Sequence, residues 1–263
     1  MKALLVASVS ATATFLVAGS ALAQAEAQGQ ASTGGQAQAS MALPGQADAV
    51  AGTSDHDQMV GRLAVGYMGR RTLQVGGAGQ APVATVEAPV VGIRYWINPM
   101  LGIDAGLGLA LGGGSWEADQ AGVSADGDLA SATAFLLHAG LPLSLASADH
   151  FSFQIVPELN VGYASISQEG PANGNDIKDT GLHFDVGARA GAEIHFGFMG
   201  IPQLSLQGSV GLRLDYESLK TEDEDSIDPD TVEQTLSTWR FATDTYDNPW
   251  NIFVSNVAAL YYF

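Results

Sequence analysis

The chain contains no cysteine and few basic residues. Without a thiol it can form no disulfide, bind no metal through a thiolate and carry no lipid attached through cysteine. Ten Lys and Arg residues face 28 Asp and Glu residues, which gives a formal net charge of −18 over 263 residues. Nucleic-acid binding requires a basic surface, so we expect no nucleic-acid partner.

Long apolar runs are also missing after the N-terminal region. No later stretch reaches the ~20 consecutive apolar residues of a transmembrane helix. Charged residues make up only 14% of the chain, while glycine contributes 32 residues. Low charge and abundant glycine are typical of a protein that places much of its surface against something other than water. An exported chain of this kind is either soluble or a β-barrel.

The N-terminus has the pattern of a secretory signal peptide. Lys2 supplies a positive charge, an apolar stretch follows, and Ala-Leu-Ala at 21–23 forms a small-residue cleavage site. The polar sequence that follows favours a cleaved signal over 1–23 rather than a membrane anchor. Residues 24–57 are rich in Gln, Ala, Gly and Ser and lack large apolar residues, so we expect a disordered periplasmic segment.

Period-two alternation recurs from Met59 to the end of the chain and places the structured domain at 58–263. In the first segment Leu63 and Val65 alternate with Ala64 and Gly66, and seven further segments repeat the pattern. The connections alternate between short turns such as "NPM" and long polar loops. This arrangement predicts an all-β fold, an eight-stranded antiparallel up-and-down transmembrane β-barrel with both termini on the short-turn, periplasmic side.

A soluble barrel around a ligand would also alternate, with its apolar face inward. The aromatic residues discriminate between the two. Tyr67, Tyr163 and Tyr216 fall at the loop ends of their segments, whereas Tyr95 and Phe153 fall at the short-turn ends. Aliphatic residues lie between these two groups, as a bilayer with two interfaces requires. We therefore expect the apolar face to contact lipid.

Three segments carry a family resemblance: "IRYWINPMLGIDAGLGLALG", "LHAGLPLSLASADHFSFQIVPELNVGYA" and "NPWNIFVSNVAALYYF". They resemble small outer-membrane β-barrel proteins of Gram-negative bacteria, the porin-like barrels of myxobacterial type and, more distantly, OmpA and OmpX. The resemblance covers 59–263. It implies a monomer in the cell outer membrane that contacts outer-membrane lipids and lipopolysaccharide. It also implies a C-terminal signal for the barrel-assembly machinery, consisting of Phe253, Val257, Ala259, Tyr261 and Phe263.

Ionisable residues on the polar face cannot all be hydrated in so narrow a barrel, so they should pair with one another. The predicted lumen ion network comprises Arg62, Arg94, Asp104, Glu158, Asp185, Arg189, Glu193, Arg213 and Asp215. Such a largely plugged lumen, together with acidic external loops such as "TEDEDSIDPD", favours a structural or surface-interaction role. The alternative is a small channel for water, ions or tiny solutes.

The third hypothesis is an enzyme. One outer-membrane deacylase family uses a His-x-Ser pair, and His150 and Ser152 match this pattern. The topology places this pair at a periplasmic turn, whereas lipid A lies in the outer leaflet. His183 and His195 lie twelve residues apart on one strand, about 40 Å, too far for a single metal site. We therefore expect no catalytic residue, no cofactor and no metal ligand.

Overall fold

A computed structural model describes residues 53–76, 84–120, 123–169, 176–223, 232–245 and 249–263, all within one compact unit, Ala49–Phe263. The predicted signal peptide and most of the 24–57 segment lie outside these residues. The described elements are α1 (Asp55–Gln58), β1 (Leu63–Val75), β2 (Ala84–Trp96), β3 (Gly102–Gln120), β4 (Val123–Gly140), β5 (Leu143–Ala148), β6 (Phe151–Glu169), β7 (Asp176–Phe196), β8 (Ile201–Asp223), β9 (Val232–Thr243) and β10 (Val257–Tyr262), with the 3₁₀ turns η1 (Gly197–Met199) and η2 (Pro249–Phe253).

Eight of the strands join into a closed ring. Strands β1, β2, β3, β4, β6, β7 and β8 pair in sequence, and β10 pairs with both β8 and β1. Every pairing is antiparallel, which confirms the prediction of an all-β, up-and-down arrangement of eight strands. The two further strands extend their neighbours: β5 pairs with the start of β6, and β9 pairs with the second half of β8.

The strands bury alternate residues, as the period-two pattern predicts. In β2, Val90, Arg94 and Trp96 are buried, while Val91 and Ile93 between them are exposed. The ring therefore turns charged and small residues inward and large apolar residues outward. None of the helices in the described ranges is long and apolar enough to cross a membrane.

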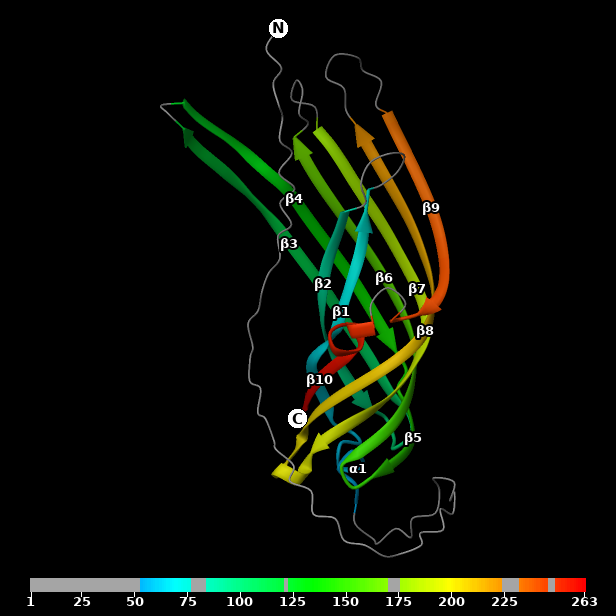
Figure 1. Cartoon of the computed structure of the whole chain (residues 1–263). Helices are drawn as coiled ribbons and strands as arrows, with labels where there is room; N and C mark the ends of the chain where they lie inside the picture. The colour runs from blue at the N-terminus through cyan, green and yellow to red at the C-terminus, as the bar shows by residue number, and fades with distance from the viewer. Residues whose placement is uncertain (1–52, 77–83, 121–122, 170–175, 224–231, 246–248) are drawn as a thin grey trace, which may run out of the picture. The chain divides into compact units, whose positions relative to one another are not determined.

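Much of what the sequence predicted to be long polar loops is β-structure. Strand β3 continues to Gln120 and β4 begins at Val123, while β8 continues to Asp223 and β9 begins at Val232, so both pairs form long hairpins (Figure 1). Residues 111–119 of β3 are all exposed. With water on both faces, the sequence needs no alternation of apolar and polar residues, so the signal that predicts strands is lost there.

Ion pairs support the β8–β9 hairpin. The ammonium nitrogen of Lys220 lies 2.6 Å from a carboxylate oxygen of Glu222 and 3.0 Å from one of Glu233 on the neighbouring strand. The hydrogen bond from Lys220 lowers the pKa of the Glu222 carboxyl. Both carboxylates belong to exposed surface, so the pairing contributes little stability.

The first strand bends away from β10 halfway along but stays paired with β2. Its register with β2 shifts between Tyr67 and Arg70, and Gly69 takes a φ of 98°, a left-handed conformation that favours glycine. Pairing between β1 and β10 ends at Tyr67.

Beyond the bend, the β1–β2 hairpin packs against inward-facing residues of the ring. Leu73 and Val86 join an apolar cluster with Leu136 of β4. The hairpin approaches β6 and β7 so closely that a Cβ at Gly162 would lie 2.7 Å from the Leu73 side chain. A Cβ at Gly181 would collide with the main-chain carbonyl of Gln74. The interior thus contains an apolar core as well as the predicted charges.

A short helix lies at the short-turn end of the ring. Ser54 caps α1 by accepting a hydrogen bond from the Asp57 amide at 3.1 Å. His56 is 1% exposed; its Nε2 lies 2.8 Å from the Pro99 carbonyl oxygen and its ring packs edge-on against Trp96. The sequence analysis placed these residues in a disordered segment. The structure differs at 53–57 because tertiary contacts, invisible to composition, order them.

Candidate functional site

Arg94 lies at the centre of a buried ion network in the short-turn half of the ring. Its guanidinium donates two hydrogen bonds to the Asp104 carboxylate, both 2.7 Å long, and one of 2.9 Å to Glu193. Asp104 is its cross-strand neighbour on β3, whereas Glu193 belongs to β7 on a distant part of the ring. The side chains of all three are fully buried. The network therefore crosses the interior from one wall to another.

Neutral groups complete the hydrogen bonding of Glu193. Its carboxylate accepts from Ser205 at 2.6 Å, from the Tyr262 hydroxyl at 2.9 Å and from Gln154 at 2.5 Å. The Trp96 indole donates in turn to the Tyr262 hydroxyl at 3.0 Å. Buried charges are tolerated when each is paired and its remaining lone pairs are satisfied, which is the case here.

Glu158 organises a second layer. It accepts from Arg71 and from Arg189, each at 2.8 Å, and Arg189 lies 3.8 Å from Asp104 in the first layer. One register row around the ring contains Arg94, Asp104, Gly140, Glu158, Gly187 and Arg213. The two glycines in this row leave the space that the long charged side chains occupy.

A third layer lies farther along the strands. His183 contacts Asp185 at 2.9 Å, and Asn160 also donates to Asp185 at 2.8 Å. Arg213 lies 3.0 Å from Asp215, which Arg240 of β9 approaches to 3.5 Å.

The structure brings together eight of the nine residues predicted for the lumen network. They are Arg94, Asp104, Glu158, Asp185, Arg189, Glu193, Arg213 and Asp215. The prediction for Arg62 is wrong: this residue is exposed and precedes β1, next to Gly61 with its φ of 77°. The alternation that points a side chain inward applies only once the strand has begun.

Sequence reasoning missed Arg71, Arg240 and the neutral residues Gln154 and Gln207. Arg71 follows the register shift in β1, so counting alternate positions from Leu63 assigns it to the outer face. Arg240 belongs to a strand that was predicted as loop. Gln154 and Gln207 are fully buried and could have been found by counting polar as well as charged residues on the inner face.

The possible catalytic and metal-binding groups have other partners. Ser152 is fully buried and accepts from Gln154 at 2.8 Å, while His150 contacts Asp55 at 2.8 Å. His150 is thus held by α1 instead of acting as a base for Ser152.

The ligand atoms of His183, Asp185 and Asp215 lie within 4.8 Å of one another. Asp215 also lies 3.0 Å from Arg213 and 3.5 Å from Arg240, so the same carboxylate takes part in the ion pairs of the third layer.

The predicted assembly signal is only partly a strand. Val257, Ala259 and Tyr261 lie in β10, and the Tyr261 ring packs edge-on against Phe263 at 5.2 Å. Phe253 instead belongs to the 3₁₀ turn η2 and packs against Trp250. Phe253 therefore lies outside the C-terminal strand, which begins at Val257, and the pairing of β10 with β1 extends only to Tyr67.

A band of exposed apolar side chains surrounds the ring. One register row joins Tyr67, Val91, Leu107, Leu137, Val161, Phe184 and Tyr216 across seven neighbouring strands. The six members of this row other than Tyr67 each expose between 38% and 58% of their surface. Soluble monomers rarely expose a continuous apolar surface of this extent.

The sequence matches no family model and no curated protein. Among solved structures, the chain is similar to the attachment invasion locus protein Ail of Yersinia pestis. The two are 12% identical with a TM-score of 0.33, over 77% of this chain and 97% of that protein. A likeness this weak carries no conclusion about function.

Proposed function

We propose that the protein is a monomeric integral β-barrel of the outer membrane, with its ring of eight strands spanning the bilayer. The observation that carries the proposal is the exposed apolar band on the outside of a ring whose interior contains buried charges. A soluble barrel would reverse this distribution. In lipid, a closed ring of strands satisfies every main-chain hydrogen bond without an exposed edge.

We further propose that the lumen is plugged and that the role of the protein is structural or a surface interaction. Three features support closure: the Arg94 network across the interior, the β1–β2 hairpin packed against β4 and β6, and α1 at the short-turn end. The fully buried Arg94 and Trp96 occupy space that a solute would need. The proposal includes no catalytic role for Ser152, because this residue is fully buried and accepts a hydrogen bond from Gln154.

The long hairpins would then extend outside the cell. Beyond Gly112 most of the described residues of the β3–β4 hairpin are exposed, among them Glu117, Asp119, Asp126 and Asp128. Acidic, fully hydrated strands of this kind suit contact with the surroundings rather than burial in a membrane.

The absence of native cysteine makes spin labelling a direct test of membrane insertion. A single cysteine at Leu137, on the apolar band, would be labelled with a nitroxide in protein reconstituted into phospholipid vesicles. We expect its relaxation to be enhanced by oxygen, which partitions into lipid, and little affected by a water-soluble nickel chelate.

Leu236 on the β8–β9 hairpin is the matched control, because 41% of its surface is exposed compared with 50% for Leu137. A label there should respond to the nickel chelate. Equal access of the chelate to both positions would show that the ring does not span the bilayer.

A further inference from the structure

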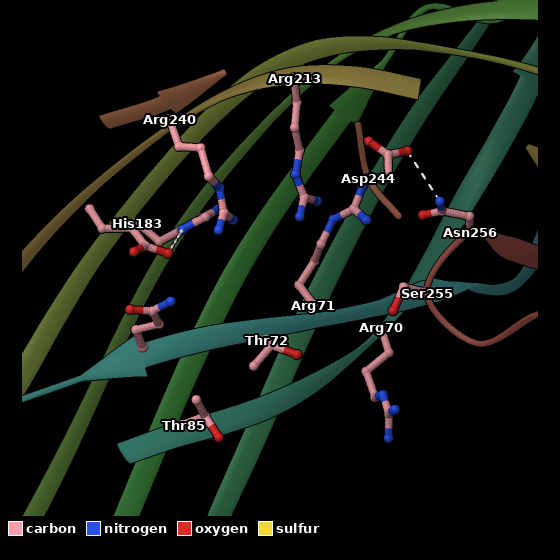
Figure 2. A pocket seen from close by; sticks show the side chains of 12 residues that line it. Arg70, Arg71, Thr72, Thr85, His183, Arg213, Arg240, Asp244, Ser255 and Asn256 are labelled. Atoms are coloured by element: carbon pink, nitrogen blue, oxygen red, sulfur yellow. Dashed lines mark hydrogen bonds and ion pairs between the residues drawn. The ribbon is translucent and has the colours of Figure 1, made fainter. Parts of the chain in front are cut away.

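A cavity of about 330 Å³ lies where the bent part of β1 separates from the last strands of the sheet. Its walls come from the β1–β2 hairpin, from β7, β8 and β9, and from the residues that precede β10 (Figure 2). In the described part of the chain β9 pairs with β8, whereas β1 beyond its bend pairs with β2. The cavity therefore lies between the β1–β2 hairpin and the β8–β9 hairpin.

The lining of this cavity is rich in arginine. Arg70, Arg71, Arg213 and Arg240, four of the ten basic residues of a chain with net charge −18, all line it. Figure 2 shows the guanidinium groups of Arg71, Arg213 and Arg240 pointing into a common space, while Arg70 points away. The carboxylates in the lining are Glu217 and Asp244.

Carboxylates outside the lining hold these guanidinium groups in place. Arg71 uses its Nη2 to contact Glu158 at 2.8 Å, and Arg213 uses its Nε to contact Asp215 at 3.0 Å. A guanidinium has five N–H donors in a fixed plane. One contact of this kind orients the group and leaves donors of Arg71 and Arg213 directed toward the cavity.

The uncharged part of the lining is also rich in hydrogen-bonding groups. Thr72 and Thr85 come from the β1–β2 hairpin, and Ser255 and Asn256 precede β10. The Asn256 amide donates to Asp244 at 3.1 Å, whereas the hydroxyl groups can donate to an anion between the arginines. An apolar group here would leave these donors unsatisfied.

We propose that this cavity binds a phosphate group. A phosphate carries up to two negative charges and three or four acceptor oxygens in tetrahedral directions, which match converging guanidinium groups better than a single carboxylate does. The group could be inorganic phosphate or the phosphate of a lipid headgroup. This site goes beyond the proposed function and does not depend on whether the ring conducts.

Isothermal titration calorimetry on the full folded chain in detergent tests the proposal. Sodium phosphate probes a free anion, dihexanoyl phosphatidic acid probes a lipid headgroup, and sodium acetate is the carboxylate comparison. Binding of either phosphate probe, with acetate much weaker, supports the site and identifies its source. No heat with either phosphate probe, or equal binding of acetate, would overturn it.

Arg213→Gln should weaken phosphate binding about tenfold or more, because a charge-assisted hydrogen bond is lost. Arg62→Gln removes the same charge from an exposed position and should leave affinity unchanged. An equal loss in both variants would mean that phosphate senses only the net charge of the protein.

A second pair of variants removes no ion pair and so keeps the test valid if Arg213→Gln fails to fold. Thr85 is exposed on the hairpin and lines the cavity. Thr85→Glu should weaken phosphate binding about tenfold by adding a negative charge near the arginines. Thr85→Gln introduces an uncharged side chain of the same size and shape as Glu and should not weaken binding. Equal affinity of the two variants would rule out phosphate in this cavity.

Discussion

Replacing Arg94 with methionine is expected to lower the free energy of unfolding by about 3–5 kcal/mol. Methionine fills a similar volume, so packing changes little. The loss arises because Asp104 and Glu193 would remain buried without the guanidinium that pairs with both. Urea unfolding in detergent, followed by the fraction of unheated protein that migrates as the folded form on a gel, measures the change.

Two comparisons separate this effect from a general intolerance of mutation. The Arg70–Glu87 pair is partly exposed, so Arg70→Met should cost no more than about 1 kcal/mol. Adding Asp104→Asn and Glu193→Gln to Arg94→Met removes the unpaired charges and should restore much of the stability. If the triple variant is as unstable as Arg94→Met alone, uncompensated charge is not the cause.

Leu107→Arg is expected to cost about 2–4 kcal/mol in protein inserted in a lipid bilayer, because a charge would lie on the lipid face near mid-strand. Leu107 is 42% exposed and lies within the apolar register row, with Gly108 beside it facing Leu136 inside. Reversible unfolding from phospholipid vesicles in guanidinium chloride measures this cost.

Leu236→Arg is the matched change on the hairpin, where the side chain is equally exposed but faces water. It should alter stability by no more than about 0.5 kcal/mol. A small cost at both positions would mean that the apolar band does not contact hydrocarbon.

The ring and most of its interior could be predicted from the sequence because one face of each strand meets a different environment from the other. The inward positions of Arg94 and Asp104 could be predicted from the alternation of residues alone, because the strands around them are regular. Alternation loses this power wherever both faces meet water, as in β9 and the outer halves of β3 and β4.

The bend of β1 could not be predicted from periodicity because it depends on tertiary contacts. Gly69 must adopt a positive φ, and the hairpin needs the missing side chains at Gly162 and Gly181 to approach the wall. The same bend limits the pairing of β10 with β1, turns Arg71 inward and opens the arginine-lined cavity. Likewise α1 is ordered by the contacts of His56 with Pro99 and Trp96.

Conductance across a planar phospholipid bilayer tests the plugged lumen most directly. The protein would first be checked for the change in gel mobility on heating that marks a folded barrel, so that a silent bilayer cannot reflect unfolded material. We predict no discrete, persistent current steps, because the Arg94 network and the β1–β2 hairpin fill the interior. Reproducible unitary openings from the pure, folded protein would contradict this result and establish a channel instead.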